Sequence, residues 1–257
     1  MKPASCHVRA LAVADLHQRK FLFDQLVAAV DEHRPEAGAG YLVACVGDFL
    51  DANLESEGKL IGEDEAAKIL SSLPSEAVFV RGNHEDEGWE KFQAAWIKTG
   101  RPLHALHGTA ASFGPLTVVG FPCWTGRDEF YGRGRELADY SPDKWFRRLM
   151  NRIGPPARSL WLIHEPPSPK LAEPFLFEAE WKDAVERYQP LLVVSGHDHN
   201  TPLESGRWRA RIGRSICINT GQRVYPKPGR LLYCVIDFEF PGDQPCFPTK
   251  FAFKKYG

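Results

Sequence analysis

Residues 8–17 read VRALAVADLH, an apolar run that ends at the polar residues Asp15 and His17. The pattern returns in YLVACVGDFLD, residues 41–51, where a second apolar run is followed by two aspartates. Short apolar runs rich in β-branched residues are typical of buried strands. We therefore expect two buried strands that each deliver polar side chains at their carboxyl ends.

Segments with apolar residues at helical spacing separate these strands from each other and from a third. The expected strands are Val8–Ala14, Tyr41–Val46 and Ala77–Val80, and the expected helices are Lys20–His33, Glu63–Leu73 and Gly88–Lys98. An alternation of strands and helices predicts an α/β layered sheet.

The second half of the chain has a different texture, with more short strands and fewer helices. Strands are expected at Leu103–Leu106, Leu116–Phe121, Ser159–Ile163, Leu191–Val194, Ile216–Asn219, Leu231–Phe240 and Thr249–Lys254, and helices at Asp143–Ile153 and Glu178–Tyr188. The proline- and glycine-rich segments between them are typical of loops inside one domain. We interpret residues 1–257 as a single α/β domain that contains two sheets.

Composition excludes several classes of protein. The 257 residues carry 32 Lys and Arg against 33 Asp and Glu, so the net charge of −1 gives no chain-wide attraction for nucleic acid or an acidic membrane surface. No apolar run approaches the roughly 18 residues that cross a bilayer, and Ala10–Ala14 is too short for a signal peptide. The six cysteines form no C-x-x-C pair, which favours reduced thiols in a cytoplasmic protein.

Polar motifs follow five of the expected strands directly. They are Asp15/His17, Gly47-Asp48 with Asp51, Gly82-Asn83-His84-Glu85, His164, and Gly196-His197-Asp198-His199. In open α/β sheets, ligands bind beyond the carboxyl ends of the strands. We therefore expect these side chains to converge at one edge of the sheet.

The residue types in these motifs are carboxylates, an amide oxygen and imidazoles, a mixture that suits Mn, Fe or Zn better than Ca or a thiolate site. Each motif taken alone has an ordinary structural explanation, since Gly, Asn and Asp are also the usual residues of turns. Five such motifs in order, each after an expected strand, favour a metal site over a coincidence of turns.

The complete series resembles the calcineurin-like metallophosphoesterases, whose motifs are D-x-H, G-D-x-x-D, G-N-H-[DE], a histidine after a strand, and G-H-x-H. The resemblance covers about residues 15–199. It implies a four-layer αββα sandwich and two bound metal ions. One ion would be held by Asp15, His17, Asp48 and His199, and the other by Asp48, Asn83, His164 and His197, with Asp48 as the bridge.

The resemblance also implies a reaction, the hydrolysis of a phosphomonoester or phosphodiester by a hydroxide that bridges the two metals. His84 is the residue expected to face the substrate phosphate, where it would stabilise developing charge or protonate the leaving group. Four carboxylates are candidates to orient the imidazoles, and which of them orients His84 is left open: Asp51, Glu85, Asp86 and Asp198.

Two further segments are candidates for substrate contact. Residues 121–145 combine glycines with aromatic and basic side chains, among them Arg127, and are interpreted either as a lid over the substrate or as a surface loop. The alternating segment Arg207–Ile212 would place three arginines on one face of a strand and Trp208, Ala210 and Ile212 on the other. A solvated strand face and a phosphate or nucleic-acid contact both fit that pattern.

The sequence thus predicts a cytoplasmic phosphoesterase that acts on a phosphate ester, with nucleotides among the candidate substrates, and has no membrane partner. A metal-dependent nuclease is the main enzymatic alternative. A non-catalytic scaffold of the same fold is the alternative from another class, but competent residues fill all seven expected ligand positions and the position of His84. The oligomeric state, the native metal and the substrate are left open.

Overall fold

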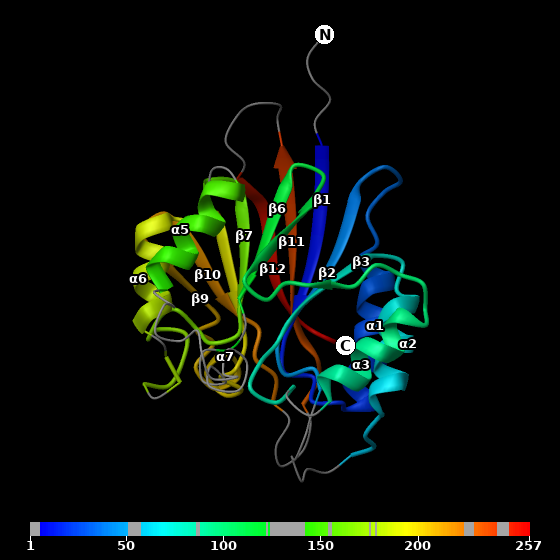
Figure 1. The fold of residues 1–257 in the computed structure, drawn as a ribbon. Coiled ribbons are helices and arrows are strands. Elements are labelled where there is room, and N and C mark those ends of the chain that lie inside the picture. Colours follow the sequence, from blue (N-terminus) through cyan, green and yellow to red (C-terminus); the bar gives the residue numbers. More distant parts are fainter. Residues whose placement is uncertain are drawn as a thin grey trace, which may run out of the picture.

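Two six-stranded sheets lie face to face, and helices cover the outer face of each (Figure 1). The computed structural model describes residues 6–50, 58–85, 88–121, 123, 142–153, 156–174, 176–177, 179–223, 229–240 and 247–257. In these residues the expected αββα architecture is confirmed.

The first sheet has the strand order β12-β11-β1-β2-β3-β4. Its strands are β1 (Cys6–Val13), β2 (Gly40–Val46), β3 (Glu76–Val80), β4 (His104–Ala105), β11 (Leu232–Phe240) and β12 (Phe247–Lys255). Strands β1 to β4 are parallel, whereas β11 runs antiparallel between β1 and β12. The chain therefore completes this sheet only with its last two strands.

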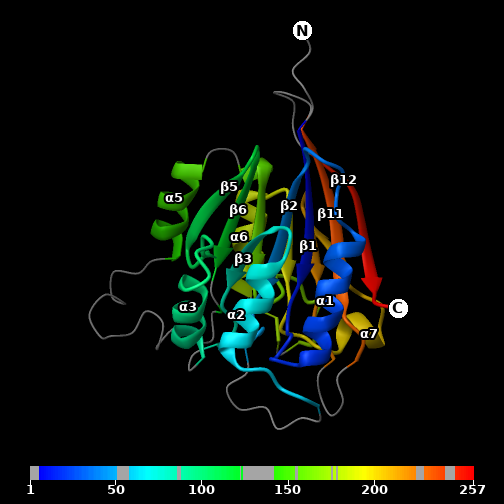
Figure 2. The same ribbon diagram turned by 90° about the vertical axis from the view of Figure 1, so that its right-hand side faces the viewer.

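Three helices pack on the outer face of the first sheet (Figure 2): α1 (Lys20–Glu32), α2 (Glu63–Ser72) and α3 (Trp89–Ile97). In α1 the buried apolar residues Leu22, Leu26 and Ala29 recur at helical spacing and face the strands. This amphipathic pattern holds the helix on the sheet.

The second sheet has the order β5-β6-β7-β8-β10-β9. Its strands are β5 (Thr109–Phe113), β6 (Leu116–Phe121), β7 (Ser159–Ile163), β8 (Leu192–Ser195), β9 (Arg209–Ile212) and β10 (Ser215–Asn219). Helices α5 (Pro142–Ile153) and α6 (Ala179–Tyr188) cover its outer face. A short helix, α7 (Thr201–Glu204), and a 3₁₀ turn at Pro156–Arg158 complete the described elements.

The layer between the sheets is built from small and branched side chains such as Ala10, Ala12, Leu42, Val46 and Leu162, all of which are fully buried. Their alternation along each strand places the other half of the strand residues under the helices. The two sheets therefore share one continuous apolar layer, which fixes their carboxyl ends relative to each other.

Two elements were not expected from the sequence. Strand β5 has the weak composition TAASF and forms because a tight turn at Gly114, with a φ of 58°, pairs Phe113 with Leu116 of β6. Helix α7 is too short to leave a periodic pattern. None of the described helices is long and apolar enough to span a membrane.

Candidate metal centre

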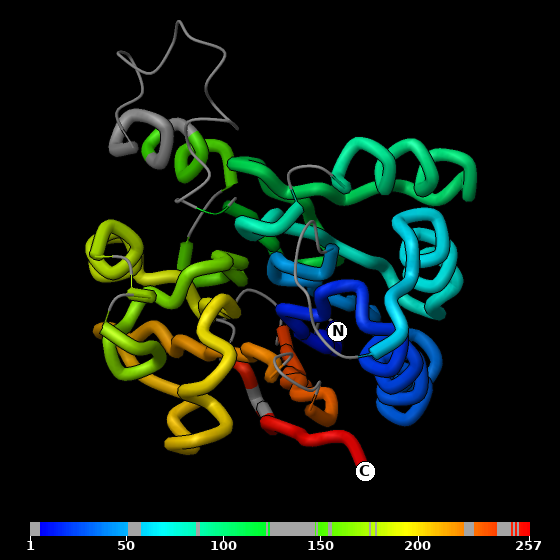
Figure 3. The backbone as a smooth tube through the Cα atoms, turned by 90° about the horizontal axis from the view of Figure 1, so that it is seen from below, coloured from blue at the N-terminus to red at the C-terminus, as the bar shows by residue number. Residues whose placement is uncertain are grey.

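The carboxyl ends of β1, β2, β3, β7 and β8 meet at one edge of the sandwich, which Figure 3 views from below. The structure brings together at this edge the seven residues expected as metal ligands. Backbone hydrogen bonds join the first two loops, since Asp15 N–H donates to Gly47 O at 3.0 Å and His17 N–H donates to Asp48 O at 2.9 Å. The predicted convergence is confirmed.

One group of donor atoms comprises Asp15, His17, Asp48 and His199, whose ligand atoms all lie within 4.8 Å of one another. The Nε2 atoms of His17 and His199 are 3.3 Å apart, and Asp15 Oδ1 lies 3.5 Å from His199 Nε2. Carboxylate oxygens and imidazole nitrogens that point at a common centre fit a transition-metal cation.

A second group comprises Asp48, His164 and His197. His164 Nε2 lies 3.1 Å from Asp48 Oδ2, while Asn83 Oδ1 lies 3.3 Å from His164 Nε2 and 3.1 Å from His197 Nδ1. Asn83 therefore lies beside this group, at the position that the resemblance assigns to it. Asp48 is the one residue that belongs to both groups.

The backbone at four of these residues adopts the left-handed conformation, which residues other than glycine rarely adopt. The φ angles are 55° at Asp15, 45° at His17, 52° at Asp48 and 68° at His197. Each such residue costs of order 1–3 kcal/mol, and such strain is concentrated at functional sites. Here the left-handed turns aim the side chains inward from the ends of their strands.

The buried carboxylates favour positive charge at the site: against the effect of burial, Asp48 raises the pKa of His164 and Asp15 raises the pKa of His199. Asp15, His17, Asp48 and His164 are almost completely buried. Burial opposes the charge of Asp48, but the neighbouring histidines outweigh it and lower the pKa of this carboxyl group below its usual range. Burial lowers the pKa of His17 to about 3, so its imidazole is neutral and able to ligate.

The Nδ1 atoms of His17 and His164 have different surroundings. His17 Nδ1 is buried and has no hydrogen-bond partner among the described residues. His164 Nδ1 lies 2.9 Å from Val46 O, and an N–H donated to this carbonyl turns Nε2 towards Asp48. Such a bond to the far side of the ring is the usual way in which a protein orients a ligating histidine.

His84 lies beside the donor groups without belonging to either. Its backbone N–H donates to Asp48 Oδ1 at 2.9 Å, and its ring makes an edge-to-face contact with His17 at 5.0 Å. The side chain is only half-buried, so it has access to a molecule that approaches the centre from solvent.

Glu85 holds the backbone of two ligand loops. Its buried carboxylate accepts N–H groups from Asp48 and Leu50, each at 2.9 Å, and from Gly82. Burial and the nearby Asp48 carboxylate raise the pKa of Glu85 to about 8, against the effect of these hydrogen bonds. Glu85 thus joins the loops after β2 and β3, and no hydrogen bond to the His84 ring is found among the described residues.

Asp198 also organises backbone. Its oxygens accept N–H groups from Glu173 at 2.6 Å, Asn200 at 2.9 Å and Thr201 at 2.8 Å, together with the Thr201 hydroxyl at 2.7 Å. It therefore fixes the start of α7 and the loop that carries His197 and His199.

The predicted candidates Asp51, Asp86 and Arg127, and residues 124–141 of the lid candidate, lie outside the described residues.

Two buried polar residues near the site were not expected from the sequence, Asn219 and Glu165. Asn219 donates from Nδ2 to Leu171 O at 2.9 Å and to Asp198 O at 3.3 Å. Glu165 accepts the Cys123 thiol at 2.8 Å and Trp181 Nε1 at 3.3 Å. Both lie at or just after the end of an expected strand. The search for polar residues at the carboxyl ends of strands could therefore have found them as well.

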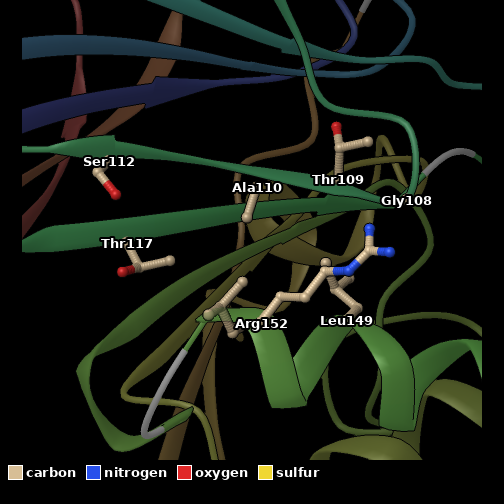
Figure 4. A pocket seen from close by; sticks show the side chains of 8 residues that line it. Gly108, Thr109, Ala110, Ser112, Thr117, Leu149 and Arg152 are labelled. Atoms are coloured by element: carbon tan, nitrogen blue, oxygen red, sulfur yellow. The ribbon is translucent and has the colours of Figure 1, made fainter.

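A separate pocket of about 360 Å³ lies between the β5–β6 hairpin and α5 (Figure 4). Its lining includes Thr109, Ser112, Thr117 and Arg152. None of the residues that line it is a candidate ligand, so this hollow is not part of the metal centre.

A sandwich of two sheets with buried Asp and His donors at its edge defines the class of fold to which known metal-dependent phosphoesterases belong. The chain matches the calcineurin-like phosphoesterase family over residues 8–201. It belongs to this family, and the resemblance found in the motifs is confirmed. No curated protein matches the chain in sequence.

Solved structures with the same fold are distant in sequence. A phosphatase from Mycoplasma pneumoniae is 11% identical, with 99% of this chain and 94% of that chain covered and a TM-score of 0.51. The purple acid phosphatase PPD1 from yellow lupin (Lupinus luteus) is 11% identical with a TM-score of 0.50. The match covers 100% of this chain but 52% of the lupin enzyme, so the chain spans about half of that protein.

Proposed function

We propose that this protein hydrolyses phosphomonoesters or phosphodiesters with two metal ions held by the seven ligand residues. The observation that carries the proposal is the position of Asp48, which belongs to both donor groups. Asp15, His17 and His199 would complete one ion site, and Asn83, His164 and His197 the other. When bound, two divalent ions supply Lewis acidity and lower the pKa of a coordinated water.

The residues of the chain have distinct tasks in this proposal. Asp15 and Asp48 are buried carboxylates whose charge holds the cations, while neutral histidine and asparagine ligands leave the loaded centre cationic and attractive to a phosphate anion. His84 is half-buried beside the Asp48 loop, where a protonated imidazole can donate to a phosphate oxygen or to the leaving group. Glu85 and Asp198 keep the ligand loops in place.

Metal reconstitution tests the proposal. The chelated, metal-free protein is titrated with Mn²⁺, Fe²⁺ or Zn²⁺, and bound metal and hydrolysis of p-nitrophenyl phosphate and bis(p-nitrophenyl) phosphate are measured together. We expect hydrolysis to rise with metal and to saturate at two ions per chain. Full turnover in the presence of a chelator would overturn the metal-dependent mechanism.

Asp48→Ala is the decisive variant because it removes a ligand from both groups. We expect it to lose bound metal and hydrolysis together. Asp183→Ala removes an exposed carboxylate from α6 and serves as the matched control, with both properties unchanged. Two ions per chain and normal turnover in Asp48→Ala would contradict the bridging role.

A further inference from the structure

Strand β9 is one of the two edge strands of the second sheet, and arginines lie on it and on either side of it. Arg209 and Arg211 are exposed, whereas Ala210 and Ile212 are buried, so the expected alternation is confirmed within the strand. Trp208 departs from the prediction, because it precedes the strand and packs against the layer between the sheets instead of joining Ala210 and Ile212. The reason is that the regular strand begins only at Arg209.

The arginines of β9 lie on the side of the second sheet that faces the first sheet. Arg209 is paired with Ile218 and Arg211 with Ile216, and both isoleucines belong to the layer between the sheets. Residues directly opposite each other in an antiparallel pair share a face. The edge is closed next to them by Trp208, whose ring stacks on Phe253 of β12 at 5.0 Å with an interplanar angle of 10°.

This row is a local concentration of positive charge. Residues 206–214 read GRWRARIGR, with four arginines and no acid, in a chain whose net charge is −1. Arg207, Arg211 and Arg214 are exposed, and they form no ion pair in the described part of the structure. Charges on an edge strand also prevent edge-to-edge aggregation, but Arg207 and Arg214 lie outside β9 and are not needed for that purpose.

The row begins next to the candidate metal centre. Trp208 O accepts the backbone N–H of Asn219 at 2.9 Å, and the Asn219 side chain donates to Asp198 O at 3.3 Å. Asp198 stands between the ligands His197 and His199. From this point β9 leads away from the metal centre, because it runs antiparallel to β10, which ends at Asn219.

We propose that the arginine row, defined as Arg207, Arg209, Arg211 and Arg214, binds the phosphate backbone of a single-stranded nucleic acid that passes the metal centre. The guanidinium group matches phosphate in geometry and keeps its charge at every physiological pH. Residues two apart on a strand are separated by about 6.7 Å, so Arg209 and Arg211 present two cations in line, with Arg207 just before the strand and Arg214 in the turn after it. A single line of arginines matches the phosphate backbone of one nucleic-acid strand.

An acidic membrane fits the row less well, because a surface that binds a membrane combines basic residues with exposed apolar side chains. The large apolar residues that are exposed among the described residues are Phe21, Leu60 and Ile97, and none of them lies on β9. The inference rests on the proposed function, since it makes a phosphodiester chain the substrate of the same centre.

The test is fluorescence anisotropy of a fluorescein-labelled single-stranded oligodeoxynucleotide with the metal-loaded protein over a range of salt concentrations. The variant Arg207→Gln/Arg211→Gln/Arg214→Gln keeps Arg209, whose guanidinium lies 5.6 Å from the centre of the Trp208 ring. We expect its affinity to fall at least about tenfold, and the slope of log K against log salt to decrease by about 2, at roughly 0.7 per lost phosphate contact.

The matched control is Lys68→Gln/Lys91→Gln/Lys98→Gln, which removes three exposed charges near α2 and α3, on the other side of the molecule. It should bind the oligonucleotide like the wild type. Equal losses in both variants, or no binding by the wild type, would overturn the proposal. Binding only to vesicles of acidic phospholipid would overturn it as well.

Hydrolysis of bis(p-nitrophenyl) phosphate separates this inference from the proposed function. Both triple variants should retain wild-type hydrolysis of this small substrate, because none of the substituted residues is a candidate ligand. A wild type that hydrolyses it yet shows no oligonucleotide binding refutes only the arginine row. A wild type that binds the oligonucleotide but hydrolyses no phosphoester refutes the proposed function instead.

Discussion

His84 lies beside the two donor groups without belonging to either of them. It contacts the ring of His17 and the carboxylate of Asp48. The link to Asp48 runs through the His84 backbone N–H, which any substituting residue except proline would keep. The imidazole can therefore be removed without removing a ligand.

We predict that His84→Ala retains most of its bound metal but hydrolyses phosphoesters roughly 10²–10⁴ times more slowly, the usual contribution of a general acid. Metal content and kcat measured on the same preparation check this. The loss should be smaller for substrates with good leaving groups such as p-nitrophenolate. Equal turnover of alkyl phosphates by the variant and the wild type would exclude a role as proton donor.

Gly82 is needed because the loop after β3 approaches the Asp48 loop closely. A Cβ atom at Gly82 would lie 2.1 Å from Asp48 Oδ1 and 2.7 Å from Asp48 N, so one loop must move to admit it. Asp48 is the residue shared by both donor groups, and a displacement there alters both ion sites.

Gly82→Ala should therefore weaken metal binding and lower hydrolysis, while the far-UV circular dichroism stays that of a folded protein. Gly62→Ala is the control, because a Cβ at Gly62 meets nothing within 4 Å. Isothermal titration with Mn²⁺ measures the effect. Wild-type affinity in Gly82→Ala would show that the loops have more freedom than the contact distances indicate.

Among the elements, most of the framework and the convergence of the candidate site residues were predictable from the sequence. An apolar run that ends in Asp, Asn or His predicts a buried strand with a functional residue at its carboxyl end. The apolar run identifies the strand, and ligands bind beyond the carboxyl ends of strands in open α/β sheets. The strands before Asp15, Asp48 and Asn83 show this pattern and lie where they were expected. The helices between them followed from their apolar spacing.

The remaining details depend on tertiary contacts. Strand β5 is held by its pairing with β6, and the packing of Trp208 depends on the neighbouring β12. The role of Glu85 also could not be predicted, since the motif places it next to His84 in sequence while the fold turns its carboxylate to three backbone N–H groups. Sequence adjacency alone does not determine which group a carboxylate contacts.

Asn219, the last residue of β10, supports the candidate metal centre through a hydrogen bond to the backbone and is not itself a candidate ligand. The fully buried side chain of Asn219 donates hydrogen bonds to the backbone carbonyls of Asp198 and Leu171. Gln222 is equally buried, but its side chain bonds to the backbone of Leu232 at the start of β11. The two amides are three residues apart and hold different parts of the molecule.

Asn219→Ala and Gln222→Ala should each destabilise the fold by about 1–3 kcal/mol, since each leaves buried polar groups unpaired. Only Asn219→Ala should also weaken metal binding and change kcat, because only Asn219 holds the loop of His197 and His199. Urea unfolding and metal titration of both variants provide the comparison. Equal metal affinity in the two variants would show that Asn219 serves stability alone.

For the molecule as a whole, the candidate metal centre lies between the two sheets and takes residues from both. Asp15, Asp48 and Asn83 follow strands of the first sheet, and His164, His197 and His199 follow strands of the second. Cations bound between them would favour the packed sandwich over any state in which the sheets separate. Bound ligand stabilises a folded protein in proportion to the logarithm of its concentration over Kd.

We expect metal at a free concentration a hundredfold above its Kd to stabilise the fold by about 2.7 kcal/mol. For a chain of this length that corresponds to a rise in Tm of roughly 5–10 °C. Differential scanning fluorimetry with Mn²⁺ and with a chelator measures the difference. Asp48→Ala should show no such rise, and an equal rise in that variant would place the stabilising ion elsewhere.

The strand order of the first sheet has a consequence for how the protein folds. Strand β1 lies inside the sheet and pairs along its length with β11, where Cys6 is opposite Phe240. Residues near the two ends of the chain must therefore meet before β1 is paired on both sides, and contacts of such long sequence separation form slowly. Asp15 and His17 follow β1 directly. We therefore expect metal capture to be a late event in refolding, with metal-dependent activity returning after most of the helical signal.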